Sequence, residues 1–432
     1  MKTKLLIIFV SLGLFVSIPY AFSSEPVGIL VHPPPLKQVQ LEISLHEIQC
    51  NGDRTLIWQK DTLKPACVFH ESELIFDRKW AKMRIGMPAE EITQEKLCLW
   101  YADNLPKYLK PYCISESKVL QSDSKPLVVM VAPSINEEYY REVFHDIIDY
   151  DIQTVNTIYG KDNVVLLVDK ETKHLFEGKI PDDALLEANV ADIWIRDFGT
   201  VDTMTEVKFD FKPQYLTNED SVWINDSFED WYDQKNLSGK KSELILDGGN
   251  LVFNGKDKAI TTVRVFEDNP QYDELAIDSR LKELLQVTEI AYLPEEEGDI
   301  TGHSDGMVMW AEPDKLLVNE YEEPFRSQVL GELEASLSGV EIIEIPYVNQ
   351  NEFWRDWPSA CGYYLNSLVT DDFIYVPVYG LTEDQMVLEL IQSHTSKEVI
   401  SIDASNVCFM GGSVRCLTWT VDGLNAEKIL EH

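Results

Sequence analysis

Basic residues are scarce in this chain of 432 residues. It holds 37 lysines and arginines against 74 aspartates and glutamates, which gives a formal net charge of −37 at pH 7 with histidine neutral. A surface this acidic repels nucleic acid and anionic membranes, and it attracts cationic small molecules or basic peptides. An adaptation for solubility or for salt explains the same charge equally well. We therefore expect no nucleic acid among the partners, and a cationic substrate is one of two open interpretations.

Long apolar runs are also missing. Beyond the N-terminus, no segment has the roughly 18 apolar residues that a membrane-spanning helix needs. At the N-terminus, two lysines precede an apolar stretch from Leu5 to about Val16, and small residues follow around Ala21 and Ser23. This pattern is typical of a secretory signal peptide, whose apolar core is too short for a permanent anchor. We expect cleavage of residues 1–23, a secreted or periplasmic protein, and no membrane insertion after cleavage.

Cysteine is infrequent, and its count of seven is odd. Seven thiols cannot all pair within one chain, so at least one stays free even in an oxidising compartment. The cysteines form two groups along the sequence, with Cys50, Cys67, Cys98 and Cys113 in the first and Cys361, Cys408 and Cys416 in the second. For the first group we predict sequential pairing, the simplest of the three connectivities that four cysteines allow: Cys50 with Cys67, and Cys98 with Cys113.

The segment after the signal peptide, residues 24–123, forms a first folded part. It begins with a proline-rich linker and contains the four cysteines of the first group. With PACV at Pro65–Val68 and KWA at Lys79–Ala81, it resembles a small cysteine-paired module that recurs in exported prokaryotic proteins. Nothing in it looks catalytic, and we predict a small disulfide-containing N-terminal module.

Helix and strand candidates alternate through residues 124–432. The run PLVVMVAP, bounded by turn residues, indicates a buried first strand. It is followed by a predicted helix over Asn136–Ile158, a strand over Asn163–Val168 and a helix around Asp182–Ala188. This alternation predicts an α/β domain.

A faint internal repeat lies within this domain. ADIWIRDFG at 191–199 is similar to NEFWRDWPS at 351–359, and DGGN at 247–250 is similar to MGGS at 410–413, with similar separations between the members of each set. A repeated unit of this size fits a closed, pseudo-symmetric ring better than an open sheet. A chance match of short strings is the alternative.

The stretch GDITGHSDG places Asp305 two positions after His303. On a strand, both side chains would point to the same face. A histidine beside a carboxylate can stay protonated, activate a thiol or donate a proton to a leaving group. A cation site is a second interpretation, because further carboxylates lie nearby at Glu295, Glu296, Glu297 and Asp299. The sequence has no HExxH and no paired-cysteine spacing, so zinc is not indicated.

Two further stretches mix polar and apolar residues. In WIRDFG, a strand would place Trp194 and Arg196 on one face and Asp197 on the other. Asp197 then either joins a buried network with Arg196 or holds a cationic ligand. In CFMGGSVRCLTW, two glycines precede Cys416 in an apolar, strand-like setting. A cysteine there is a small core residue, half of a disulfide or a nucleophile.

Taken together, five motifs resemble those of the Porphyromonas-type peptidylarginine deiminase and agmatine deiminase family. They are WIRDFG, DGGN, GHSD, YYLN at Tyr363–Asn366 and GGSVRC, and they occur in the family's order over roughly Pro126–Leu424. The resemblance implies a pentein fold, an α/β propeller of five ββαβ-type blades with one active site near the pseudo-symmetry axis. It also implies an enzyme with no cofactor and no metal.

The resemblance implies the reacting groups as well. Cys416 matches the nucleophile, His303 the general acid and base, and Asn366 the group that orients the nucleophile or the intermediate. In this chemistry a thiolate attacks the guanidinium carbon, and the histidine protonates departing ammonia. The histidine then activates the water that cleaves a covalent amidino-thioether.

Carboxylates complete the implied site. Asp197 and Asp305 match the residues that hold the substrate guanidinium, while Trp194 and Asp247 would line the pocket. A delocalised guanidinium is a poor electrophile, so planar carboxylates must fix it before a soft thiolate can attack.

Some residues depart from the pattern of agmatine deiminases. Arg415 stands where a histidine usually precedes the cysteine, Met309 and Trp310 stand where an RF pair follows the GHxD motif, and Thr200 replaces a common proline. Export also argues against free agmatine, whose metabolism is usually cytoplasmic. We therefore predict an exported guanidino-group hydrolase that converts arginine in peptides or proteins to citrulline and ammonia.

Several alternatives stay open at this point. An agmatine deiminase would make N-carbamoylputrescine, and an amidinotransferase would pass the amidino group to an amine. A catalytically silent relative would only bind a ligand. A cysteine protease is a further class, but paired carboxylates would repel its oxyanion.

Overall fold

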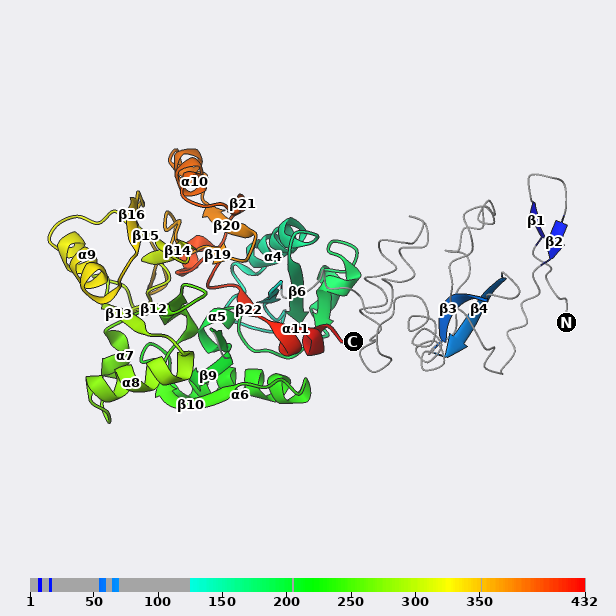
Figure 1. Cartoon of the computed structure of the whole chain (residues 1–432), viewed down its shortest axis with the longest axis horizontal. Helices are drawn as coiled ribbons and strands as arrows, with labels where there is room; N and C mark the ends of the chain where they lie inside the picture. Colours follow the sequence, from blue (N-terminus) through cyan, green and yellow to red (C-terminus); the bar gives the residue numbers. More distant parts are fainter. Residues whose placement is uncertain are drawn as a thin grey trace, which may run out of the picture. The chain divides into compact units, whose positions relative to one another are not determined.

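The computed structural model describes residues 7–9, 15–17, 54–59, 64–69, 125–203, 206–350 and 352–431 (Figure 1). The chain divides into two compact units, Met1–Ser122 and Asp123–His432. In the first unit, two antiparallel strand pairs are described: β1 (Ile7–Phe9) with β2 (Phe15–Ser17), and β3 (Arg54–Gln59) with β4 (Lys64–Phe69).

Most of the first unit lies outside the described residues. Cys50, Cys98 and Cys113 are among these, so the disulfides Cys50–Cys67 and Cys98–Cys113 stay predictions. The same holds for the signal peptide and the N-terminal module. Within the part of the chain that the structure describes, no helix combines the length and the apolar character that crossing a membrane requires.

In the described part of the second unit, five sheets of three or more strands share one plan. In each, an antiparallel pair of strands is followed by a helix and by a strand that pairs in parallel with the second strand of that pair. Four of these triplets are β8 (Val201–Asp202), β9 (Glu206–Asp210) and β10 (Lys240–Ile245); β11 (Val252–Phe253), β12 (Lys258–Thr262) and β13 (Glu289–Leu293); β14 (Val308–Glu312), β15 (Lys315–Asn319) and β16 (Glu341–Ile345); and β19 (Leu368–Val369), β20 (Phe373–Val378) and β21 (Glu398–Asp403).

The fifth sheet brings the two ends of this unit together. Its strand β22 (Trp419–Val421) pairs antiparallel with β5 (Leu127–Val131), which pairs in parallel with β6 (Asn163–Val168). A fourth strand, β7 (Leu185–Glu187), pairs in parallel with β6. The predicted strand over Asn163–Val168 is therefore confirmed, as is the mixed α/β class.

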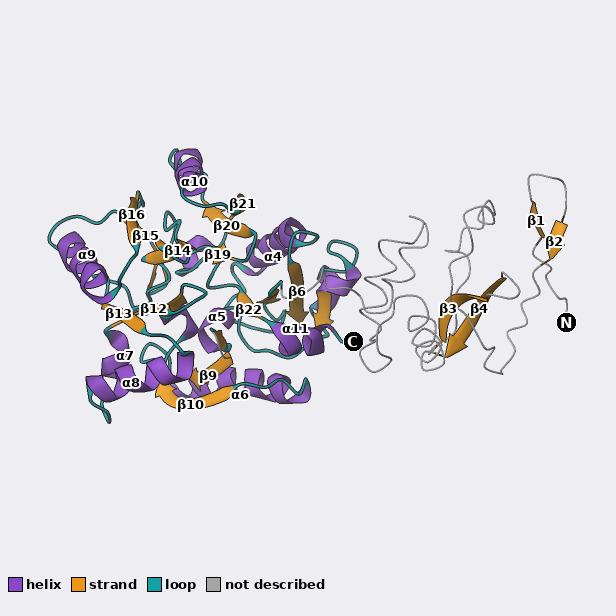
Figure 2. Cartoon of the chain, in the orientation of Figure 1, coloured by secondary structure: helices purple, strands orange, loops and turns teal. Residues whose placement is uncertain are grey.

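Most of the longer helices lie at the edge of the second unit. Figure 2 shows α6, α8, α9 and α10 at its periphery and the short helix α5 near its middle. The helices are α4 (Phe144–Ile158), α5 (Ile195–Phe198), α6 (Asn218–Gln234), α7 (Arg264–Asp268), α8 (Glu274–Leu285), α9 (Phe325–Ser336), α10 (Asp384–Ser393) and α11 (Gly423–Leu430).

Hydrophobic patterning explains these positions. On α4, buried apolar residues recur at three- and four-residue spacing, as at Phe144, Ile147 and Ile148, so one stripe of the helix faces the core. All residues of β5 are buried, as expected for a strand that is covered on both faces. Burial of this continuous apolar surface is the main favourable contribution to folding.

Two predicted helices differ from the structure. The helix expected from Asn136 begins only at Phe144, because the preceding residues form turns such as the one in which Glu137 N donates to Ser134 O. The helix expected around Asp182–Ala188 is wrong. A single 3₁₀ turn there leads directly into β7, whose pairing with β6 overrides the local helical preference.

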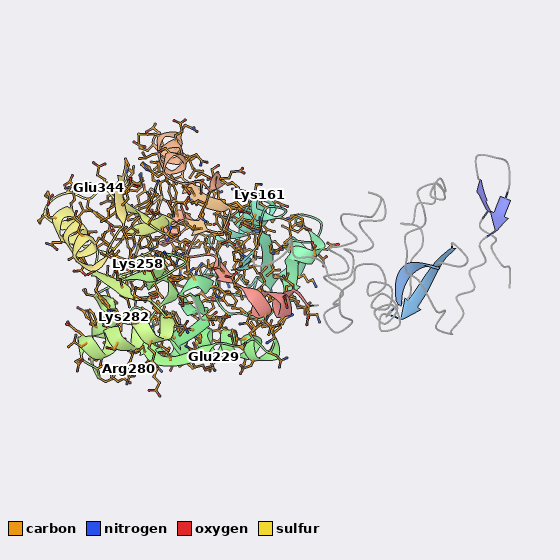
Figure 3. All side chains as sticks on the ribbon, viewed as in Figure 1. Lys161, Glu229, Lys258, Arg280, Lys282 and Glu344 are labelled. Atoms are coloured by element: carbon orange, nitrogen blue, oxygen red, sulfur yellow. A yellow bond between two sulfur atoms is a disulfide. The ribbon has the colours of Figure 1, made fainter. Side chains whose placement is uncertain are left out.

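Several basic side chains of the second unit form ion pairs with acidic ones, among them Lys258 and Lys282, which Figure 3 labels. Lys258 Nζ lies 2.7 Å from Glu289 Oε2, and Lys241 Nζ lies 2.8 Å from Glu229 Oε2. Such exposed or half-buried pairs each contribute little to stability. The whole chain keeps a formal net charge of −37, so the attraction for cations stays one of the two interpretations of its composition.

Candidate active site

The predicted site residues lie on the connections that lead from one sheet to the next. Asp197 belongs to the β7–β8 connection, Asp247 to β10–β11, and His303 with Asp305 to β13–β14. Asn366 lies before β19, and Cys416 lies between β21 and β22. Each of the five sheet-to-sheet connections therefore contributes at least one polar side chain.

His303 is held between two carboxylates. Its Nε2 lies 3.1 Å from Asp247 Oδ2, and its Nδ1 lies 3.7 Å from Asp197 Oδ1. Burial favours the neutral imidazole, but Asp197 and Asp247 outweigh it and raise the pKa of His303 to about 10. His303 is therefore a cation at neutral pH, ready to donate a proton.

Cys416 is the free thiol among the cysteines whose side chains are described. Cys361 and Cys408 form a disulfide with each other. Asn366 Nδ2 donates to Cys416 Sγ at 3.1 Å, and Asp305 Oδ2 lies 3.9 Å from the sulfur. Burial and the charges of nearby carboxylates raise the pKa of the Cys416 thiol well above its ordinary value, so the thiol is neutral in the empty site.

The amide of Asn366 has a defined orientation. Its Oδ1 accepts hydrogen bonds from the backbone N of Ser413, the hydroxyl of Ser413 and the backbone N of Cys416, at 3.2, 3.0 and 3.4 Å. A flipped amide would set its NH₂ group against the two backbone N–H groups, which can only donate. The NH₂ group must therefore face the sulfur, where it favours the thiolate.

This arrangement makes Ser413→Ala informative. Loss of one donor loosens the amide of Asn366, so we expect turnover to fall about tenfold, the value of one hydrogen bond, with alkylation of Cys416 shifted to higher pH. Ser367→Ala is the matched control, because this buried hydroxyl donates to Tyr364 O at 2.6 Å and does not touch the Asn366 amide. Equal pH profiles for the two variants would contradict the assigned orientation.

Two glycines allow the site groups to approach one another. A Cβ atom on Gly249 would lie 2.5 Å from both Asp197 Oδ1 and His303 Nδ1. A Cβ on Gly412 would lie 2.5 Å from the Trp194 ring and 3.1 Å from Cys416 Sγ. Glycines in the similar motifs DGGN and MGGS therefore allow close packing at the site.

Asp305 is buried and contacts a second functional loop. Its backbone N donates to Gly249 O at 3.2 Å, which fixes the GHSD turn against the DGGN turn. Its Oδ2 lies 3.4 Å from Arg415 Nε. Burial raises the pKa of the Asp305 carboxyl, and Arg415 and His303 oppose this.

Three carboxylates of the acidic run before His303 have partners in or near this loop. Asp299 Oδ2 accepts from His303 N at 3.1 Å, and Glu296 Oε2 accepts from the Tyr321 hydroxyl at 3.0 Å. Glu295 pairs with Arg264. Among the described residues, no group of three His, Cys, Asp or Glu side chains has the arrangement of a metal site.

Aromatic residues border the histidine. The Tyr215 hydroxyl donates to Asp247 Oδ2 at 2.7 Å, and its ring lies 6.2 Å from the His303 ring. Trp357, on the hairpin of β17 (Phe353–Trp354) and β18 (Trp357–Pro358), lies 5.6 Å from the Tyr215 ring. Tyr215 was missed at the sequence level, since it stands in a loop without a motif.

The local geometry predicted for the motifs was wrong. WIRDFG is the short helix α5 rather than a strand, GHSD is a turn, and residues 408–418 form a 3₁₀ turn, η7 (Cys408–Met410), and further turns. Within the described residues, Arg196 and Asp197 form no ion pair with each other. Instead Arg196 Nε donates to Arg415 O at 3.4 Å. These segments are short connections, so strand periodicity does not apply to them.

Comparison with known proteins places this geometry in a family. The family model for Porphyromonas-type peptidyl-arginine deiminase matches residues 122–421. A curated protein named "Putative agmatine deiminase" from Enterococcus faecalis is 21% identical over 293 residues, which cover 55% of this chain and 77% of the relative.

Solved structures share the fold. Agmatine deiminase of C. jejuni matches with a TM-score of 0.60 and 20% identity over 68% of this chain and 93% of its own. Agmatine deiminase of Enterococcus faecalis matches with a TM-score of 0.57 and 17% identity, over 68% and 93%. The chain therefore belongs to the Porphyromonas-type peptidyl-arginine deiminase family, a family of guanidino-group deiminases that hydrolyse amidine C–N bonds.

Proposed function

We propose that this protein hydrolyses the guanidino group of arginine residues in peptides or proteins, forming citrulline and ammonia. The main support for this proposal is that a thiol, a cationic histidine and buried carboxylates lie close together. Asn366 donates to Cys416 Sγ. His303 lies between Asp197 and Asp247. Carboxylates at these positions suit a planar cation, and the thiol suits attack on its carbon.

The reaction begins with binding of the guanidinium beside Asp197 and Asp305. Its positive charge offsets the carboxylates, so the pKa of the Cys416 thiol falls and the thiolate forms, with the proton passing to solvent. The sulfur then bonds to the guanidinium carbon and gives a neutral tetrahedral adduct. His303 protonates one nitrogen, the C–N bond breaks, and ammonia leaves a cationic amidino-thioether.

In the second half of the reaction, His303 accepts a proton instead of donating one. Neutral His303 takes a proton from water, and the resulting hydroxide adds to the thioether carbon. The C–S bond breaks and returns the Cys416 thiolate, and the product loses a proton to give the ureido group of citrulline. The overall exchange consumes one water and releases one ammonium.

We infer that the five sheets of the second unit are the blades of a pentein propeller. Three observations support this arrangement: the common strand plan, the pairing of β22 with β5, and the supply of site residues by all five sheet-to-sheet connections. A closed ring brings such connections to one axis, where five loops can share one site.

Peptidyl arginine is the proposed substrate because Arg415 departs from the agmatine deiminase pattern beside the nucleophile. The departures at Met309, Trp310 and Thr200 are weaker evidence about the substrate, because all three residues are buried within or beside strands. Thr200 Oγ1 also donates to Glu206. Export, proposed from the signal-peptide pattern of residues 1–23, would place the enzyme among extracytoplasmic peptides.

A substrate panel tests this function. We expect carbamoyl product from peptides with internal or C-terminal arginine, at a higher kcat/KM than from free arginine or agmatine. Agmatine is the second candidate, because the similar proteins of C. jejuni and Enterococcus faecalis carry that activity in their names. Turnover of agmatine alone would refute the peptide assignment. Absence of ammonia without an added amine would indicate an amidinotransferase.

A further inference from the structure

Arg415 lies beside the nucleophile but has no part in the reaction described above. Its side chain is only 17% exposed, and its Nε lies 3.4 Å from Asp305 Oδ2. Its Nη2 donates to Leu251 O at 3.0 Å, and its backbone N donates to Asn366 O at 3.1 Å. Arg415 is therefore fixed at both ends, with its positive charge directed at one carboxylate.

Asp305 needs such a charge. Its side chain is 2% exposed, and an isolated buried carboxylate takes up a proton rather than remain charged. Other charged groups also face it, since His303, Arg196 and Asp299 act on its titration. His303 is already held by Asp197 and Asp247, and Arg196 donates to Arg415 O. Within the described residues, Arg415 is the cation at ion-pair distance from Asp305.

We propose that Arg415 is a positioning residue that keeps Asp305 ionised in the empty site, so that Asp305 can accept the substrate guanidinium. The inference rests on the proposed function, in which Asp305 holds that guanidinium. Arg415 Nε is buried and has no hydrogen-bond partner in the described part of the chain. Because the two groups attract by charge without this hydrogen bond, the lone pairs of Asp305 stay available for substrate N–H groups.

The sign of the effect follows from the surroundings of Asp305. Burial raises the pKa of this carboxyl, and Arg415 gives the largest opposing contribution. Without the Arg415 charge, the pKa of Asp305 rises further, and a larger fraction of the carboxyl is protonated. A protonated Asp305 binds a guanidinium poorly, and raising the pH above its new pKa restores binding.

Two substitutions separate charge from shape. Arg415→Gln removes the charge, and Arg415→Lys retains it. For Arg415→Gln we expect kcat/KM at neutral pH to fall by about tenfold or more. The acid limb of the plot of kcat/KM against pH should move up by about one pH unit or more, because one unit changes the ionised fraction of Asp305 about tenfold. Arg415→Lys should keep the acid limb of the unaltered protein. Lys258→Gln is the control, because this cation pairs with Glu289 in a neighbouring strand.

Titration of Asp305 gives a readout that does not depend on turnover. The carboxyl resonance of ¹³C-labelled aspartate, assigned through Asp305→Asn, should titrate at higher pH in Arg415→Gln and not in Lys258→Gln. An unchanged Asp305 titration, or an activity loss that is equal at every pH, would overturn the inference. If the titration moves but no guanidino compound is turned over by the unaltered protein, the proposed function fails and the role of Arg415 stands.

Discussion

Cys416→Ala is expected to abolish ammonia release from guanidino substrates and to leave their binding measurable. In the proposed reaction the sulfur is the atom that bonds to the guanidinium carbon, and no neighbouring group in the described site replaces it. Asp197 and Asp305, which we propose hold the cation, remain in the variant. Ammonia assays and calorimetric titration with an arginine-containing peptide check the two halves of this result.

Alkylation of the Cys416 thiol, which is neutral when no cation is bound, is a second test of the same prediction. A cationic haloacetamidine should alkylate Cys416 much faster than neutral iodoacetamide, because its charge offsets Asp305 and Asp197 and lowers the thiol pKa. Equal rates for the two reagents, or residual ammonia release from the alanine variant, would rule out Cys416 as the nucleophile.

Asp197→Asn is expected to reduce turnover by about 10³-fold or more while the fold persists. The carboxylate lies 3.7 Å from His303 Nδ1, and in the proposed reaction it also holds the substrate cation, so it has two tasks. The amide keeps the shape and loses the charge that both tasks need. Steady-state kinetics, with circular dichroism for folding, measures the effect.

Asp192→Asn is the matched control for this variant. Asp192 is a neighbouring carboxylate that accepts from the Tyr140 hydroxyl at 2.6 Å and serves the loop before α5. We expect its loss to lower the melting temperature with little change in turnover. Near-normal turnover in Asp197→Asn would instead give Asp197 a structural role beside His303.

The sequence motifs predicted the reacting groups more accurately than they predicted the local backbone structure. The order of five motifs pointed to the residues that the structure brings together, because reacting groups must be of particular types. Their backbone geometry could not be derived in the same way, since each motif is a connection a few residues long. Asp197 and His303 lie in a helical turn and a loop turn, where a period-two pattern has no meaning.

The internal repeat was informative only in part. DGGN and MGGS both contribute to 3₁₀ turns, at η6 (Gly248–Asn250) and η7, so this likeness is structural. WIRDFG and FWRDWP differ, because the first forms α5 and the second forms the β17–β18 hairpin. Tyr215 and Ser413 were not singled out, since their roles depend on contacts with residues far away in the chain.

The buried, protonated state of Cys416 has a consequence for the lifetime of the protein. Peroxides and disulfides react with thiolates far faster than with thiols, so a nucleophile held neutral and only 8% exposed resists sulfenic acid formation. The enzyme should therefore age slowly in oxidising surroundings while empty. By the proposed mechanism, its vulnerable period is turnover, when the bound cation favours the thiolate that oxidants attack.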